Sequence, residues 1–106
     1  SSILSSGLTR IQTATFLGCT SLVTIVLPNT ITTLGADNNP NYGAFYNCTA
    51  LSNDSLNNIL GMCANATSYT GTKTLNNIGL TSEQATICTG LSNWASAQSA
   101  GWSKGY

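Results

Sequence analysis

Apolar residues recur at a fixed spacing in the first half of the chain. Leu8 and Ile31 are separated by the same number of positions as Ile11 and Leu34. The spacing of 23 predicts an internal repeat, which we take as the basic unit of the fold.

A second match, at a spacing of 29, joins the segments 15–22 and 44–51, which share Phe, Cys, Thr and Leu at the same places. Removing six residues between the two segments restores the spacing of 23. The stretch 36–43 contains Pro40, Gly43 and three Asn, and it shows no apolar periodicity. We interpret it as a loop inserted into one repeat.

A period of this length with few apolar positions is typical of a solenoid, in which each turn buries a face only against its neighbours. The alternating, mostly β-branched residues 24–27 suit a short strand. Pro28 ends that strand because it has no N–H for a ladder. The pattern predicts one short strand in each turn.

The complete spacing is Phe16-x2-Cys19-x2-Leu22-x2-Ile25-x-Leu27-Pro28-x2-Ile31-x2-Leu34-Gly35, followed by Ala44-Phe45-x2-Cys48-x2-Leu51. This motif resembles the BspA-like leucine-rich repeat family over about residues 4–51. The resemblance implies parallel strands and a coil with Phe and Cys inside it. It also implies that Ile25 and Leu27 point inward, with Thr24 and Val26 on the open sheet face.

Cys19 and Cys48 occupy equivalent places in successive turns. We expect both to be buried as small apolar thiols, about one turn apart, beside Phe16 and Phe45. The even number of cysteines also permits disulfides. A reactive thiol is the weakest alternative, because the chain has no His to deprotonate it.

The repeat is expected to stop near residue 52, since a step of 29 from Ile25 reaches Asp54 and would bury a charge. A step of 23 back from Leu27 reaches Leu4, so earlier turns are expected before Ser1. The predicted fold is an α/β solenoid with short parallel strands over 1–52, truncated at its N-terminal side. A small C-terminal helical segment, 53–106, caps it.

Three helices are predicted in this cap segment. Residues 54–64 carry apolar side chains on one face and should cover the last turn of the solenoid. Thr81 and Gln84 form a capping-box pattern that opens a second helix. A third helix is expected over 93–100, before Gly101. The whole segment resembles the C-terminal part of surface or phage tail-associated proteins of gut bacteria.

Polarity comes from hydroxyls and amides instead of charge. Thr, Ser and Asn make up 41 of the 106 residues, whereas Lys and Arg number three and Asp and Glu number three. This composition disfavours disorder and leaves no basic groove for nucleic acid. No apolar run has the length of a membrane span, and no cysteine spacing suggests zinc. We therefore expect no nucleic-acid partner, no membrane insertion, no metal and no cofactor.

Catalytic chemistry is also disfavoured. Proton transfer needs a His or convergent carboxylates, and the three acids lie far apart in the sequence: Asp37, Asp54 and Glu83. The run Asp37-x-Asn39-x-Asn41 imitates the start of a calcium loop. However, Tyr42 replaces the glycine of the sharp turn and Cys48 replaces the final Glu, so a plain turn is the simpler interpretation.

The function predicted is a non-enzymatic binding or adhesion module of a secreted, cell-surface or virion protein such as a tail fibre. Its partner would be a host-cell surface protein or glycan, or other subunits of a surface or virion assembly. Tyr and Asn suit such partners through stacking and amide hydrogen bonds. The alternative is a structural spacer, cap or assembly subunit without a ligand. The candidate contact residues are Asp37, Asn38, Asn39, Asn41, Tyr42 and Tyr46.

Overall fold

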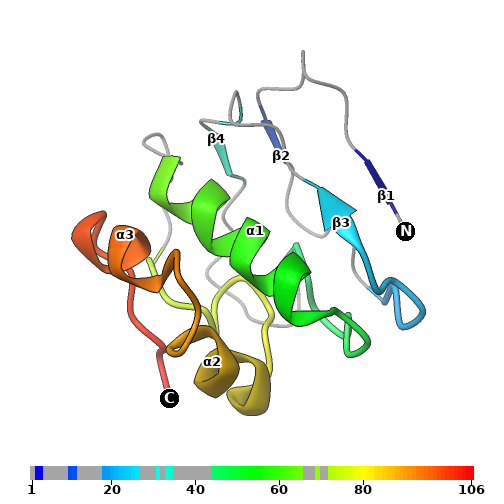
Figure 1. Ribbon diagram of the computed structural model, residues 1–106. Coiled ribbons are helices and arrows are strands. Elements are labelled where there is room, and N and C mark those ends of the chain that lie inside the picture. Colours follow the sequence, from blue (N-terminus) through cyan, green and yellow to red (C-terminus); the bar gives the residue numbers. More distant parts are fainter. Residues whose placement is uncertain are drawn as a thin grey trace.

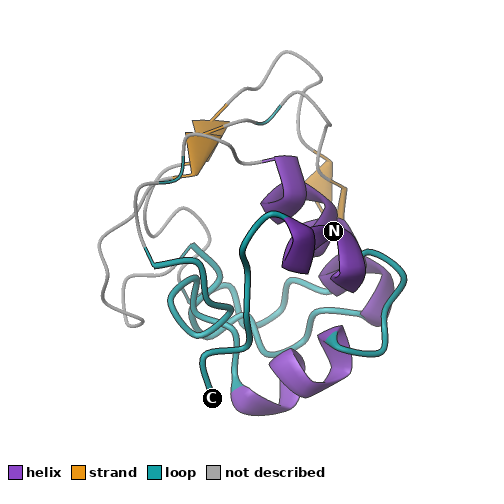
Figure 2. Ribbon diagram, turned by 90° about the vertical axis from the view of Figure 1, so that its left-hand side faces the viewer, coloured by secondary structure: helices purple, strands orange, loops and turns teal. Residues whose placement is uncertain are grey.

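Short parallel strands lie on one side of a long helix, α1 (Asn53–Asn65), and two shorter helices lie on its other side (Figure 1). The computed structural model describes residues 2–3, 10–11, 18–26, 31, 33–34, 44–65, 69 and 72–106. Figure 2 shows the strands at the upper end of the molecule, with helices reaching to the lower end. The helix α1 therefore lies between the strand half and the helical half.

The strands pair in parallel with partners that lie one predicted repeat away in the sequence. β1 (Ser2–Ile3) pairs with β3 (Ile25–Val26), and the register places Ser2 opposite Ile25. β2 (Arg10–Ile11) pairs with β4 (Thr33–Leu34), and Arg10 lies opposite Thr33. Both registers confirm the predicted spacing of 23.

Side chains at and next to the strand β3 alternate between exposed and buried. Ile25 is fully buried, whereas Val26 is 44% exposed and Thr24 is also exposed. Successive residues of a strand point to opposite faces, so the alternation predicted for this segment is confirmed at these three positions. Leu27 lies outside the described residues.

Two turns of the repeat lie against each other. The backbone N–H of Gly18 donates to the carbonyl of Tyr46 over 2.8 Å. Gly18 and Asn47, which are equivalent in the match between 15–22 and 44–51, both adopt the left-handed conformation, with φ of 77° and 63°. Asn is among the few residues besides Gly that tolerate this region, so sequence and backbone repeat together.

Cys48 is buried as predicted, but the prediction for Cys19 was wrong because its side chain is exposed. The difference lies in what covers each thiol. Cys19 itself lies against the Cys48 thiol, and Gln84 Nε2 donates to the Cys48 carbonyl at 2.8 Å. No described segment covers Cys19 in that way. Phe45 is fully buried beside Cys48 in the core, and Phe16 lies outside the described residues.

All four cysteines are free thiols, and three of them are buried. Burial raises the pKa of Cys48 and of Cys88 to about 11. Burial likewise raises the pKa of Cys63, and the neighbouring Cys88 adds to the shift. These three thiols therefore stay protonated at neutral pH and act as small apolar side chains.

Helix α1 confirms the prediction of a helix over 54–64. One face is buried against the strands and against the other helices, α2 (Ser82–Cys88) and α3 (Trp94–Ser99). Asp54 lies in the first turn, where the helix dipole favours a carboxylate. The apolar residues of the buried face are Leu56, Ile59, Leu60, Met62 and Cys63.

Polar side chains of α1 close one edge of β3. Ser55 Oγ accepts a hydrogen bond from the N–H of Ile25 at 3.0 Å and donates to the carbonyl of Val23 at 2.7 Å. Asn58 Nδ2 donates to the carbonyl of Ile25 at 2.9 Å, and Ser52 N donates to Val23 O at 2.9 Å. The helix thus occupies the side on which a further strand would pair with β3.

The second helix begins as predicted. The N–H of Gln84 donates to Thr81 Oγ1, and Gln84 Oε1 accepts from the N–H of Thr81, so both halves of the capping box are present. Ala85 and Cys88 are buried, which confirms their expected inward direction. The third helix is also confirmed, and Gly101 follows its last turn with a φ of 100°.

An aromatic pair in the helical half was not apparent from the apolar pattern. Trp102 is 3% exposed and stacks on Tyr69 with ring centroids 5.1 Å apart. Trp102 Nε1 donates to the carbonyl of Cys63, and Asn77 Nδ2 donates to the Tyr69 hydroxyl. The bond to Cys63 joins the segment after α3 to the last turn of α1, and the bond from Asn77 holds Tyr69 beneath it in the stacked pair.

We expect Ser55→Ala to lower the free energy of unfolding by about 1–3 kcal/mol, because the N–H of Ile25 would lose its buried partner and the carbonyl of Val23 would keep only the Ser52 N–H. Urea melts followed by circular dichroism measure this change. Ser96→Ala, on the exposed face of α3, is the matched control and should stay within about 0.5 kcal/mol of the parent. Equal stability of the two variants would contradict the edge-closing role of Ser55.

Candidate functional site

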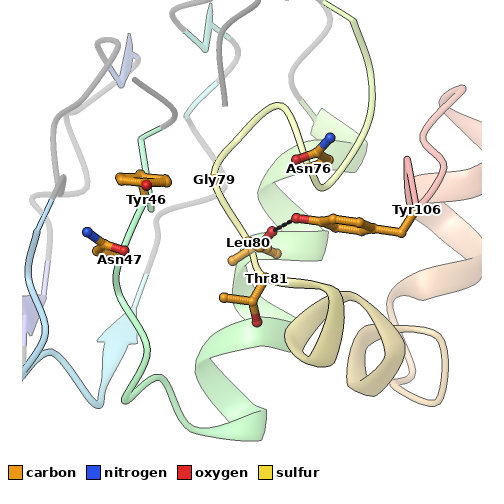
Figure 3. Close-up of a pocket in the computed structure, with 7 residues that line it drawn as sticks. All are labelled: Tyr46, Asn47, Asn76, Gly79, Leu80, Thr81 and Tyr106. Atoms are coloured by element: carbon orange, nitrogen blue, oxygen red, sulfur yellow. Dashed lines mark hydrogen bonds between the residues drawn. The ribbon is translucent and has the colours of Figure 1, made fainter. Parts of the chain in front are cut away.

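A pocket opens where the turn at residues 44–47 meets the segment 76–81 (Figure 3). Its volume is about 180 Å³. Tyr46 and Asn47 lie on one side of it, and Tyr106 points in from the opposite side. The described residues that line it are Tyr46, Asn47, Asn76, Gly79, Leu80, Thr81 and Tyr106.

A close backbone contact holds the two walls together. The N–H of Phe45 donates to the carbonyl of Ile78 at 2.9 Å. Gly79 has a φ of 96°, and a Cβ at this position would overlap the backbone N of Tyr46. Only glycine combines that conformation with so close an approach, so Gly79 determines the spacing of the walls.

The segment 76–81 continues the stack of turns. Ile78 directly precedes the left-handed Gly79, as Tyr46 directly precedes the left-handed Asn47. In both cases the carbonyl before the left-handed residue accepts a hydrogen bond from the preceding turn. The pocket therefore lies between two successive, similar turns.

Tyr106 is held by a hydrogen bond at its hydroxyl, while much of the residue is exposed to solvent. The hydroxyl donates to the carbonyl of Leu80 at 2.6 Å, while the residue as a whole is 59% exposed. Partial burial raises the pKa of Tyr106 above its usual value, so the phenol remains a hydrogen-bond donor at neutral pH. The ring is thereby held at the pocket with a face available to a ligand.

The described lining residues carry polar side chains but no charged one. Within the described part of the chain, the side-chain amides of Asn47 and Asn76 make no hydrogen bond. Each amide offers both a donor and an acceptor. Thr81 Oγ1 is already engaged by the Gln84 N–H. A ligand in the pocket could therefore form hydrogen bonds with side-chain amides and pack against aromatic rings.

Among the predicted contact residues, Tyr46 is the one that lies in this pocket. The others, Asp37, Asn38, Asn39, Asn41 and Tyr42, lie outside the described residues, and so does the start of the apparent calcium loop. The pocket includes residues that the sequence analysis did not propose: Asn47, Asn76, Gly79, Leu80, Thr81 and Tyr106. One signal was present, because Gly79-Leu80-Thr81-Ser82 echoes Gly18-Cys19-Thr20-Ser21.

We also searched the described residues for a metal site, a pair of carboxylates and a membrane-spanning helix. They contain no group of three or more His, Cys, Asp or Glu side chains that could hold a metal ion. Asp54 and Glu83 are exposed on different helices and line no common pocket. Of the helices described, none has the length and apolarity that crossing a membrane requires.

Comparison with protein families gives one match. The model of the BspA type leucine rich repeat region (6 copies) matches residues 1–90. The match passes residue 51, where the resemblance found in the sequence ended, and includes α1, α2 and most of the pocket walls. No curated protein and no solved structure matches the chain.

We expect Gly79→Ala to be more destabilising than Gly18→Ala by about 1–3 kcal/mol. Both glycines have positive φ, so both variants carry the strain of a left-handed alanine. A Cβ at Gly18 meets nothing within 4 Å, whereas a Cβ at Gly79 overlaps the Tyr46 backbone. Chemical denaturation of the two variants gives the difference, and equal losses would show that the walls are not in close contact.

Proposed function

This chain belongs to the BspA-type leucine-rich repeat family, and on that basis we propose that it is a non-catalytic binding or adhesion module of a secreted, cell-surface or virion-displayed protein. Leucine-rich repeats are interaction modules whose stacked turns present an extended surface to a partner. The partner we propose is a protein or glycan on a host-cell surface.

The proposal includes a solenoid in which each repeat unit adds one strand. The two parallel pairings, both in the register of the repeat, support it. In such a coil Ile25 belongs to the interior, and Thr24 and Val26 belong to the open sheet face. Their burial and exposure agree with those places.

The observation that carries the binding role is the pocket beside Tyr46, whose described lining has no charged side chain. A rigid wall formed by stacked turns holds aromatic rings and unengaged amides toward solvent, which is how binding residues are commonly presented on a repeat scaffold. The inserted loop at 36–43 directly precedes this wall in the sequence. We propose that the loop and the pocket contribute to one contact surface.

A structural role is the second candidate, and the closed edge of β3 favours it. Ser55 and Asn58 take up the backbone groups that a further strand would use. A helix in that place ends strand addition and protects the edge from pairing with other chains. In this alternative the segment is a cap or an assembly subunit without a ligand.

Removing six residues from the 36–43 loop should leave the melting temperature unchanged, because shortening a surface loop has little effect on stability. Attachment to intact host cells or to a glycan array should fall by about tenfold if the loop contributes contacts worth about 1.4 kcal/mol. Undiminished attachment would remove the loop from the site. Absence of attachment by the parent chain to every cell and glycan would favour the structural role.

A further inference from the structure

We propose that the pocket between Tyr46 and Tyr106 binds a single neutral sugar ring, such as a hexose or an N-acetylhexosamine, at the end of a glycan. The inference rests on the proposed binding function and specifies the class of ligand for that site. Size, lining chemistry and rigidity of the pocket each point to this class.

The size of the pocket restricts the ligand to one small ring. Its volume of about 180 Å³ is well below the usual range of about 300–1,000 Å³ for sites that enclose drug-sized ligands. The pocket opens to solvent between the two turns, so the rest of a chain of sugars can extend outward. A terminal residue of a glycan fits both conditions.

The lining offers the two kinds of contact that a pyranose requires. One face of such a ring presents C–H groups, which pack on the aromatic faces of tyrosines. Its hydroxyls donate and accept at once, and the amides of Asn47 and Asn76 do the same. Tyr46 and Asn47 approach from one wall and Asn76 from the other, so both kinds of contact surround the opening.

Charge distinguishes this ligand class from acidic ones. Among the described residues, the seven that line the pocket include no Lys, Arg, Asp or Glu. A phosphate, sulfate or sugar acid would lose its hydration without gaining an ion pair, which is costly in a partly enclosed site. A peptide anchor would require a deeper apolar pocket, and Leu80 is the sole aliphatic side chain among the lining residues that the structure describes.

The walls are fixed before a ligand arrives. The hydroxyl of Tyr106 is tied to the Leu80 carbonyl, and Gly79 holds the segment 76–81 against the Tyr46 backbone. Thr81 is held by the capping box of α2. A weak ligand such as one sugar ring benefits from such preorganisation, because little ordering entropy remains to be lost.

Titration of the full chain with methyl glycosides tests the proposal. The probes are methyl glucoside, methyl galactoside, methyl mannoside and methyl N-acetylglucosaminide, with glucuronate and glucose 6-phosphate as charged controls. ¹H–¹⁵N correlation spectra should show saturable shifts at Tyr46, Asn47 and Asn76 with at least one neutral glycoside and a Kd of about 1 mM. The charged sugars should bind about tenfold more weakly, or not at all.

Variants separate the roles of the lining residues. Asn76→Ala and Tyr46→Ala should each weaken binding by about tenfold, the equivalent of about 1.4 kcal/mol. Tyr106→Phe keeps the ring but loses the bond that ties it to the Leu80 carbonyl, so it should weaken binding less than Tyr46→Ala does. Asn65→Ala, an exposed asparagine at the far end of α1, is the matched control and should bind like the parent. The spectra also report whether each variant is folded, and Asn76→Ala serves alone if Tyr46→Ala unfolds.

Three results would overturn the inference: no saturable shift with any neutral glycoside, equal binding of the charged sugars, or full affinity in folded Asn76→Ala. If the parent attaches to cells but ignores all sugars, the binding function stands and the sugar pocket is wrong. If a peptide library shifts the same resonances and the glycosides do not, the ligand is a peptide and the inference also fails.

Discussion

Strands of two residues cannot supply their own partners, and the structure depends on how their backbone N–H and C=O groups are paired. A buried backbone group without a partner costs about as much as a lost hydrogen bond. On one side β3 pairs with β1, one repeat earlier in the chain. On the other side the N–H and the carbonyl of Ile25 bind Ser55 and Asn58 of α1. The position of α1 follows from this requirement, and its apolar face then forms a large part of the core.

The same principle of one turn satisfying the next also builds the candidate site. The turn at residues 44–48 accepts a hydrogen bond from Gly18 and donates one to Ile78. Left-handed residues, Gly18, Asn47 and Gly79, mark three successive turns of this stack. Because the turns are held at a close spacing, the side chains beside them form a fixed pocket. The backbone hydrogen bonds between the turns therefore contribute both to stability and to the shape of the proposed binding site.

The sequence was sufficient to predict features that depend on local spacing. The register of the repeat, the alternation at Ile25 and Val26, the helix α1 and the capping box at Thr81 all follow from residues near one another or at a regular period. Exposure of Cys19 was not predictable in this way, because two residues with the same local pattern differ in what covers them. The contributions of Asn76 and Tyr106 to the pocket also depend on tertiary contacts, since neither belongs to an apolar period.

Residue-resolved amide hydrogen exchange tests most directly whether the stacked turns and α1 form one hydrogen-bonded unit. The account predicts that the amides of Ile25, Gly18 and Phe45 exchange slowly and are released together with the amides in the middle of α1, since each donates to a neighbouring element. Exchange of these three amides at the rate of an unstructured chain, while α1 remains protected, would contradict it.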